Sequence, residues 1–299
     1  DPLLLGISGE PENGTVVILS GLGFGVNPSP EPLIWDDFES GSNGINIAGN
    51  APSIGNAWED IYTATEQRPE YTSKNQRINS GLSSRHIYED AIGWYSALIY
   101  TNENLPKAFM SFWWRFDNTG PVWSRNVKPW MVYGNLEGGN RPMVYVGMAD
   151  SHGSLRTAVL DTMPVTGDTI WGETKLPAID EEWIRLEAWL ELSAPGVADG
   201  TFQVWTHRPY ASTPNIALEL DSGENQIMTR SSTGHWKQWH IGTYMAVDNP
   251  SEATGNIQVD DIYISSTRAR IEIGNANRWN NVTHREVQIA RDWSDNSVS

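Results

Sequence analysis

The sequence predicts an all-β protein, an antiparallel two-sheet sandwich of the jelly-roll type. Short runs rich in β-branched and aromatic residues recur along the 299 residues, separated by clusters of Gly, Asn, Asp and Pro. The 27 Gly and 17 Pro suit many short strands better than long helices. No window shows a helical stripe over three turns, whereas several alternate apolar and polar side chains. About a dozen strands without intervening helices are typical of a sandwich or jelly roll.

A short β-structured segment, residues 1–28, precedes the predicted sandwich. It contains the apolar run Thr15–Leu19, and the Pro-rich stretch Pro28–Pro32 marks its boundary because proline cannot serve a central strand. Residues 29–299 show no second change in composition and no repeat, which predicts one jelly-roll domain. The strands predicted there are Ser96–Tyr100, Ala108–Phe116, Met131–Tyr133, Met143–Gly147, Trp183–Leu192, Thr201–Trp205, Ile216–Leu220, Gln238–Met245, Ile257–Ile264, Arg268–Ile273 and Arg285–Ile289.

Alternation gives each strand an apolar face and an opposite face, and the opposite faces carry an unusual set of side chains. Aromatic rings pack against the C–H faces of sugars, while Arg, Gln and His supply directed hydrogen bonds, so this set suits a polysaccharide groove. The same pattern also fits ordinary solvent-facing positions of an antiparallel sheet. The substrate-binding candidates are Trp113, Arg115, Arg125, Trp130, Trp183, Arg185, Trp189 and Gln238.

The charge balance excludes several classes of protein and leaves one positive window. A net charge of −17 argues against nucleic acid as a partner, because binding to phosphate chains depends on Lys and Arg. The chain has no cysteine, and no apolar run of 18 residues predicts a membrane span. Between Lys107 and Arg141, five basic residues stand against two acidic ones, a local charge of +3 that can hold an anionic ligand.

The motifs of the common hydrolases and nucleotide-binding proteins are absent from the sequence. There is no G-x-S-x-G, no P-loop or dinucleotide fingerprint in its strand–helix context, and no H-E-x-x-H. Glu187 and Glu191 share a strand face but lie roughly 13 Å apart, beyond the range of a glycosidase pair. Glycosidase chemistry stays open, although no carboxylate pair indicates it.

β-Elimination on a uronate polymer fits the residues that remain. The reaction needs a group that neutralises the carboxylate, a base for the neighbouring C–H proton, and an acid for the leaving oxygen. Arg, Lys, Gln or His can serve the first role, and Tyr or His can serve the others. A nearby cation would help a Tyr to lose its proton. The catalytic candidates are Lys128, Arg141, Tyr145, His240 and Tyr244.

Several segments resemble the concanavalin-like jelly-roll polysaccharide lyases. Trp183–Glu187, Leu192–Gly196 and Asp199–Trp205 resemble the "W-x-x-(I/L)-E … N-x-P-G … D-G … W" stretch of that family, and Gln258–Ile264 resembles its closing strand. Lys128-Pro129 and Arg141–Tyr145 are similar to the strands that line the cleft in the alginate- and glucuronate-cleaving branch.

The resemblance implies the same fold and lyase activity, with coverage from about Trp35 to Ile264. The chain departs from the family pattern where Trp130 replaces a Gly after Pro129 and where Ala194 replaces a frequent Thr. Both departures concern the assignment of Lys128 as a catalytic residue. The D-G-x-F-x-V-W piece is common to many jelly-roll binding modules, so it supports the fold better than the activity. Leu3–Gly25 resembles the opening hairpin of an IPT/TIG domain.

The same resemblance implies a structural calcium ion where the first and last strands of the sandwich meet. Asp37 and Glu39, together with Asp36, would meet Asp261 or Asp260 there, and calcium prefers oxygen ligands of this kind. Capping of turns by acidic side chains is the alternative for these residues. No other cofactor is expected.

We expect a secreted or cell-surface, carbohydrate-active protein that acts as a monomer, with a polysaccharide as its partner and no membrane partner. The leading hypothesis is a lyase that cleaves an acidic polysaccharide. The alternatives are a non-catalytic carbohydrate-binding module or adhesin domain, and a structural domain of a virion or cell surface. The lyase hypothesis requires that Arg115, Arg141, Tyr145, His240 and Tyr244 line one trough.

Overall fold

The structure is a computed structural model of residues 1–299. It describes the chain apart from residues 1, 11, 13, 60–67, 79, 88–92, 95–96, 103–104, 118–125, 136–141, 149–153, 161–169, 178–180, 210–214, 222–226, 231–232, 247–255 and 279–280. Within the strands, the backbone alone is described for residues 93–94, 126–127, 129, 145–148, 154–160, 170–177, 215–221 and 243–246.

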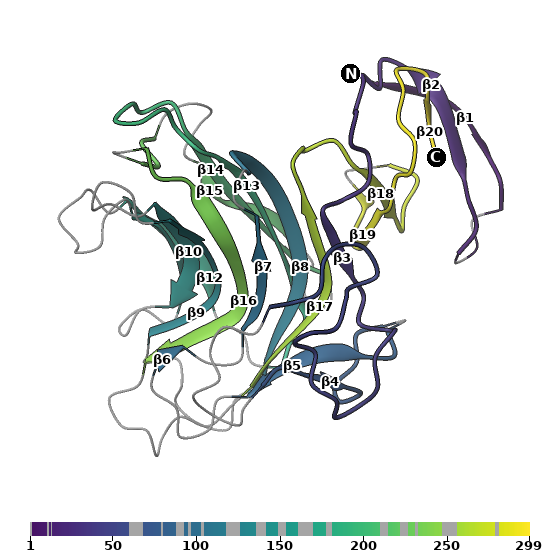
Figure 1. The fold of residues 1–299 in the computed structure, drawn as a ribbon. Helices are drawn as coiled ribbons and strands as arrows, with labels where there is room; N and C mark the ends of the chain where they lie inside the picture. The colour runs from purple at the N-terminus through teal and green to yellow at the C-terminus, as the bar shows by residue number, and fades with distance from the viewer. Residues whose placement is uncertain are drawn as a thin grey trace.

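Two antiparallel sheets face each other, which confirms the predicted sandwich. In the described residues the inner sheet has seven strands, in the order β12 (Ile170–Pro177), β11 (Ser154–Leu160), β10 (Met143–Met148), β9 (Asn126–Gly134), β16 (Trp236–Ala246) and β6 (Gly93–Trp94), with β7 (Leu98–Thr101) also paired to β16. The outer sheet has eight, in the order β15 (Asn215–Asp221), β14 (Thr201–Arg208), β13 (Ile184–Glu191), β8 (Lys107–Asp117), β17 (Asn256–Ser265), β5 (Ser83–Ile87) and β4 (Glu70–Thr72), with β3 (Ile34–Asp36) paired to β17. Figure 1 shows both sheets bent the same way, with the inner sheet on the inside of the bend.

The core lies between the two sheets and follows the predicted alternation. Met110, Phe112, Leu186 and Leu190 are fully buried in it, and their neighbours in β8 and β13 point to the other side of the outer sheet. Trp130 also lies in this core with 0% exposure. It was expected to bind substrate, but the alternation of β9 directs it between the sheets, so its indole is out of reach of a polymer.

Both ends of the chain meet in a small sheet beside the sandwich (Figure 1). Strands β1 (Leu3–Ser8) and β2 (Ile18–Leu22) form an antiparallel hairpin, and β20 (Ser297–Val298) pairs with β2. The small sheet therefore contains residues from beyond the predicted lead-in. The boundary at residue 28 and the likeness to an IPT/TIG domain stay predictions.

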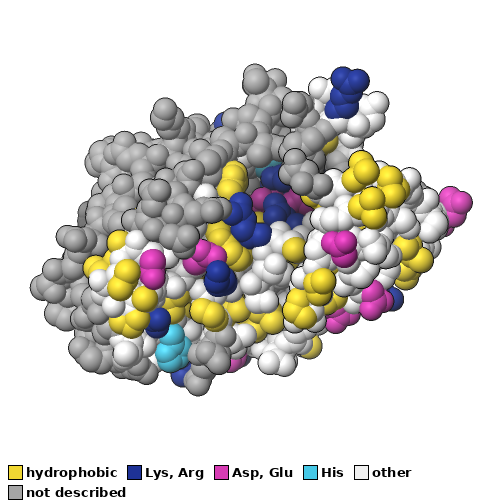
Figure 2. All heavy atoms as spheres, turned by 90° about the horizontal axis from the view of Figure 1, so that it is seen from above, with side chains coloured by type: hydrophobic (Ala, Val, Ile, Leu, Met, Phe, Trp, Pro, Cys, Tyr) yellow, Lys and Arg dark blue, Asp and Glu magenta, His cyan; other side chains and the backbone are white. Residues whose placement is uncertain are grey.

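The small sheet exposes apolar side chains, and Figure 2 shows hydrophobic groups at the surface on its side of the molecule. Leu5 is 64% exposed and Ile7 is 63% exposed. Elsewhere on that view basic and acidic side chains lie together in a hollow. Within the part of the chain that the structure describes, no helix is both long enough and apolar enough to span a membrane.

A second hairpin, β18 (Ile271–Gly274) and β19 (Arg285–Gln288), connects the sandwich to the C-terminal strand. It packs on the side of the outer sheet that faces away from the core. Val287 of this hairpin is buried with Phe109, Trp189 and Tyr263 in a second apolar cluster. The C-terminal segment thus covers part of the outer sheet, which decides where a functional site can lie.

Candidate active site

The polar face of the outer sheet is closed by an ionic layer under the β18–β19 hairpin. Arg185, Arg270 and Arg285 each pair with both Glu187 and Glu272, at N–O distances between 2.6 and 3.4 Å. Arg185 is 1% exposed and also donates to the Arg285 carbonyl and to Ser111 Oγ. Buried charges need such complete pairing. Arg185 was expected to bind substrate, but its guanidinium is committed to this layer.

The other candidates of the outer sheet are also engaged within the protein. Trp113 is 1% exposed, and its indole lies under the guanidinium of Arg77 at 5.0 Å. Trp189 is 7% exposed and lies beneath Arg268. Trp183 donates its indole N–H to the Asn75 carbonyl at 2.9 Å.

Arg115 pairs with Asp117 at 2.8 Å on the same outer face. Arg115 therefore lies in a different sheet from Tyr145, His240 and Tyr244. This corrects the expectation of a single trough: the alternation was right, but the outer and inner sheets present their polar faces on opposite sides of the sandwich.

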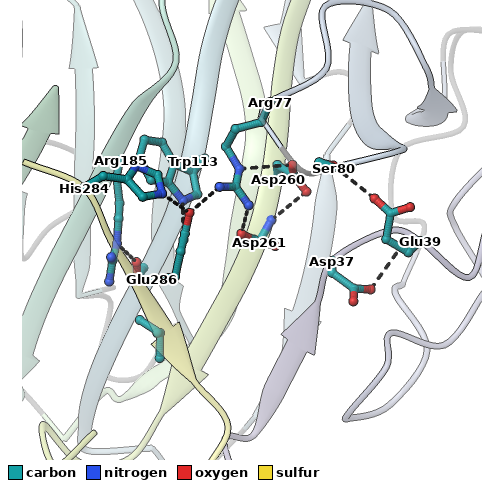
Figure 3. Close-up of polar contacts among 12 residues, drawn as sticks. Asp37, Glu39, Arg77, Ser80, Trp113, Arg185, Asp260, Asp261, His284 and Glu286 are labelled. Carbon is teal, nitrogen blue, oxygen red and sulfur yellow. Dashed lines mark hydrogen bonds and ion pairs between the residues drawn. The ribbon is translucent and has the colours of Figure 1, made fainter. Parts of the chain in front are cut away.

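The acidic residues predicted to bind calcium instead form hydrogen bonds and ion pairs with other groups of the protein (Figure 3). Glu39 accepts hydrogen bonds from the Ser80 hydroxyl and from the backbone N–H groups of Gly81 and Leu82. Asp37 accepts from Ser53. These are the turn-capping roles named as the alternative.

Arg77 occupies the position where a cation was expected. Its side chain is 7% exposed and pairs with Asp261, with Glu286 and, at 3.4 Å, with Asp260. Among the described residues, no group of three His, Asp or Glu side chains is placed to hold a metal ion. Asp37, Glu39 and Asp261 thus do not fit a calcium ion, because a guanidinium already neutralises the carboxylate of Asp261.

Burial shifts the pKa of several carboxyl groups in this region. Desolvation raises the pKa of Asp261 to about 6, against the opposing effect of Arg77. Desolvation also raises the pKa of Asp36 to about 6, although its carboxylate accepts hydrogen bonds from the Trp58 indole and the Phe38 backbone. These groups lie on the outer sheet and at its edge, so their titration affects the stability of the fold.

The inner sheet brings a different set of candidates into one row across its strands. His240 in β16 stands opposite Met131 of β9 and Ile99 of β7, and Tyr145 in β10 stands opposite Met131 from the other side. Directly opposed residues share a face of a sheet. Trp239 and Ile241, on either side of His240, lie in the core, so His240 belongs to the concave face of the inner sheet.

His240 and Tyr133 form the centre of this face. The imidazole of His240 is 3% exposed, and its ring centroid lies 6.0 Å from that of the half-buried Tyr133. Burial lowers the pKa of His240 to about 4, so the imidazole is uncharged at neutral pH. Gln238, half-buried, pairs with Tyr133 in the register and so joins the same face.

Tyr133 was not among the candidates drawn from the sequence. The signal was present, because Trp130 and Val132 have the apolar character of core positions and Tyr133 follows them on the opposite side. It was missed because a strand as short as Met131–Tyr133 gives too little alternation to assign faces.

Lys128 and Tyr244 stand opposite each other in the register of β9 and β16. The ladder between β16 and β9 is irregular between Ile241 and Tyr244, and the ladder between β10 and β9 is irregular nearby. For Tyr145 and Tyr244 the structure describes the backbone position alone, and Lys128 is half-buried. Arg125 and Arg141 lie outside the described residues.

Comparisons with known proteins agree with this fold. No protein-family model and no curated protein matches the sequence. Among solved structures, the chain is similar to the endo-β-1,4-glucuronan lyase from the fungus Trichoderma reesei, with a TM-score of 0.52, 12% identity, and coverage of 76% of this chain and 96% of that one. An alginate lyase from Aplysia kurodai gives a TM-score of 0.46 at 13% identity, with coverage of 66% and 86%.

The binding domain of Paraclostridial Mosquitocidal Protein 1 is also similar, with a TM-score of 0.44, 11% identity, and coverage of 79% of this chain and 49% of that one. At 12% identity and a TM-score of 0.52, the likeness to the glucuronan lyase shows a shared fold and no more, since one fold hosts many functions. The chain therefore has the fold found in jelly-roll polysaccharide lyases.

Proposed function

We propose that this protein is a polysaccharide lyase that cleaves an acidic, uronate-containing polymer by β-elimination on the concave face of the inner sheet. The observation that carries the proposal is the buried, uncharged His240 beside the phenol of Tyr133, in one face with Gln238 and the register position of Tyr145. The likeness in fold to a glucuronan lyase is consistent with it.

The residues of this face divide the reaction among them. The amide of Gln238 and an N–H of His240 donate hydrogen bonds to the uronate carboxylate, which makes the neighbouring C–H more acidic. A base removes that proton, the electron pair forms the C4=C5 double bond, and the C4–O bond to the next sugar breaks. The leaving oxygen takes a proton from an acid, and the phenol of Tyr133 is suited to that role.

Two candidates named from the sequence, Lys128 and Arg141, complete the proposal. Lys128, opposite Tyr244, supplies the cation that would lower the pKa of a tyrosine acting as base. Arg141 precedes β10 in the sequence and is proposed to bind the carboxylate of the substrate. A polymer substrate outside the cell agrees with the secreted or surface location that the sequence predicts.

The test is incubation of the protein with glucuronan, alginate, hyaluronan and pectin while absorbance is followed at ~235 nm, where the new double bond conjugated to the carboxylate absorbs. We expect absorbance to rise with at least one polymer, and this rise to be lost in His240→Ala while polymer binding is retained. Binding of a glycan with no rise in absorbance would instead identify a carbohydrate-binding module.

A further inference from the structure

We propose that His86, which belongs to the outer sheet, is a positioning residue for the active site of the inner sheet: its imidazole fills the side-chain space of Gly242 and so holds the irregular turn of β16 that separates His240 from Tyr244. This inference rests on the proposed function, because it gives that site a second layer of support.

Gly242 lies midway between the two candidate residues and has a backbone that other residues avoid. Its φ of +72° is in the left-handed region, where glycine has no steric cost. A Cβ added here would lie 2.4 Å from His86 Nδ1, with the other nearest ring atoms at 2.5 and 2.6 Å. Three nearly equal distances mean that the imidazole ring covers the place of a side chain at position 242.

His86 is itself held firmly within the outer sheet. Its ring is 0% exposed and its Nε2 lies 3.0 Å from Ser84 Oγ. The Ser84 hydroxyl donates to the Val259 carbonyl, also at 3.0 Å, so Ser84 must accept from the Nε2–H of His86. This chain of hydrogen bonds fixes the tautomer and the orientation of the ring against β17.

The contact bears on the chemistry through the register of β16. Between Ile241 and Tyr244 this strand advances one residue more than β9, so the pairing of Tyr244 with Lys128 depends on how the chain turns at Gly242. Such irregularities re-aim side chains next to active sites. A ring wedged from the opposite sheet gives this turn a rigid support that an apolar side chain of different shape would not reproduce.

A double-mutant cycle between the two positions tests the contact. Gly242→Ala is expected to lower kcat at least tenfold with a smaller change in KM, because its methyl group collides with the ring and because an L residue is strained at this φ. His86→Ala is expected to lower kcat also, by releasing the turn. The double variant should be less impaired than the product of the two single effects predicts, because the methyl then enters the vacated space. Independent, multiplicative effects would overturn the proposal.

A milder variant and a matched control separate positioning from stability. His86→Gln keeps an amide N–H that reaches Ser84 but loses the ring, so it should fold and still reduce kcat at constant melting temperature. Ser83→Ala removes an equally buried side chain of the same strand and should leave kcat unchanged. Equal kcat in His86→Gln and wild type would contradict the inference.

A readout without substrate distinguishes this inference from the proposed function. In protein labelled with 15N-histidine, the ring signals and the titration midpoint of His240 should move in His86→Gln and stay in place in Ser83→Ala. If wild type cleaves no uronate polymer, the proposed function fails while this measurement still decides the role of His86. Unmoved His240 signals overturn the inference even when wild type is active.

Discussion

Replacement of Arg185 by Ala separates a structural residue from a substrate-binding one. In the structure this guanidinium has two carboxylate partners and donates to Ser111 Oγ at 2.9 Å and the Arg285 carbonyl at 2.8 Å. Removing it leaves Glu187, 2% exposed, with one cation fewer at a buried position. The loss of one partner of a buried ion pair costs about 3–5 kcal/mol.

The assay is thermal unfolding followed by circular dichroism, combined with uronate cleavage at ~235 nm below the transition. A loss of 3–5 kcal/mol corresponds to a fall of roughly 6–20 °C in melting temperature on the scale of 150–250-residue domains. Below that transition, KM and kcat should equal those of wild type, because the residue lies on the outer sheet.

Lys107→Ala is the matched control on the same pair of strands. Lys107 pairs with Glu191 at 2.7 Å, but its side chain is 59% exposed, so its loss should cost about 1 kcal/mol or less. An Arg185→Ala protein that melts like the control, or that keeps its stability but loses affinity for substrate, would refute the assignment of Arg185 to the ionic layer.

Three further predictions concern the active site and the buried charges. Tyr133→Phe should lower kcat by about 10²–10⁴, as expected for loss of an acid–base group, with the melting temperature unchanged; a fully active variant would remove Tyr133 from the mechanism. Acidification from pH 6.5 to 4 should lower the free energy of unfolding by up to about 3 kcal/mol through His240. The unfolded chain gains a proton on this residue over that range, whereas the folded chain, with a His240 pKa of about 4, does not. Asp36 and Asp261, with pKa values raised to about 6, act in the opposite direction and stabilise the folded chain on acidification. The contribution of His240 is therefore measured as the difference in acid unfolding between wild type and His240→Gln. An identical pH dependence in the two proteins would contradict it. Calcium or EDTA should leave the melting temperature of wild type unchanged, while Arg77→Ala should lower it by several degrees; a calcium-dependent shift in wild type would show a metal site that the described residues do not provide.

The sequence was sufficient for the fold and for the faces of its long strands. In β8 and β13 the alternation over eight or more residues assigns every side chain correctly, because one face must enter the core. The predicted runs do not include β3, β4, β5, β6, β11, β12 or β20. Strand β18, Ile271–Gly274, begins three residues later than the predicted run.

The location of the site could not be read from the strands alone. Alternation identifies the face that is away from the core, but it does not identify which later segment covers that face. Arg185 and Trp113 have the residue types of a sugar-binding surface, and the β18–β19 hairpin buries both. The pairing of Tyr244 with Lys128 depends on an irregular ladder that strict alternation does not anticipate.

The most direct test of the active-site location is a crystal structure of the His240→Ala protein soaked with a uronate tetrasaccharide. We expect the sugar on the concave side of the inner sheet, with its carboxylate near Gln238 and a glycosidic oxygen near the hydroxyl of Tyr133. A tetrasaccharide bound instead over β8 and β13, against the C-terminal hairpin, would contradict it.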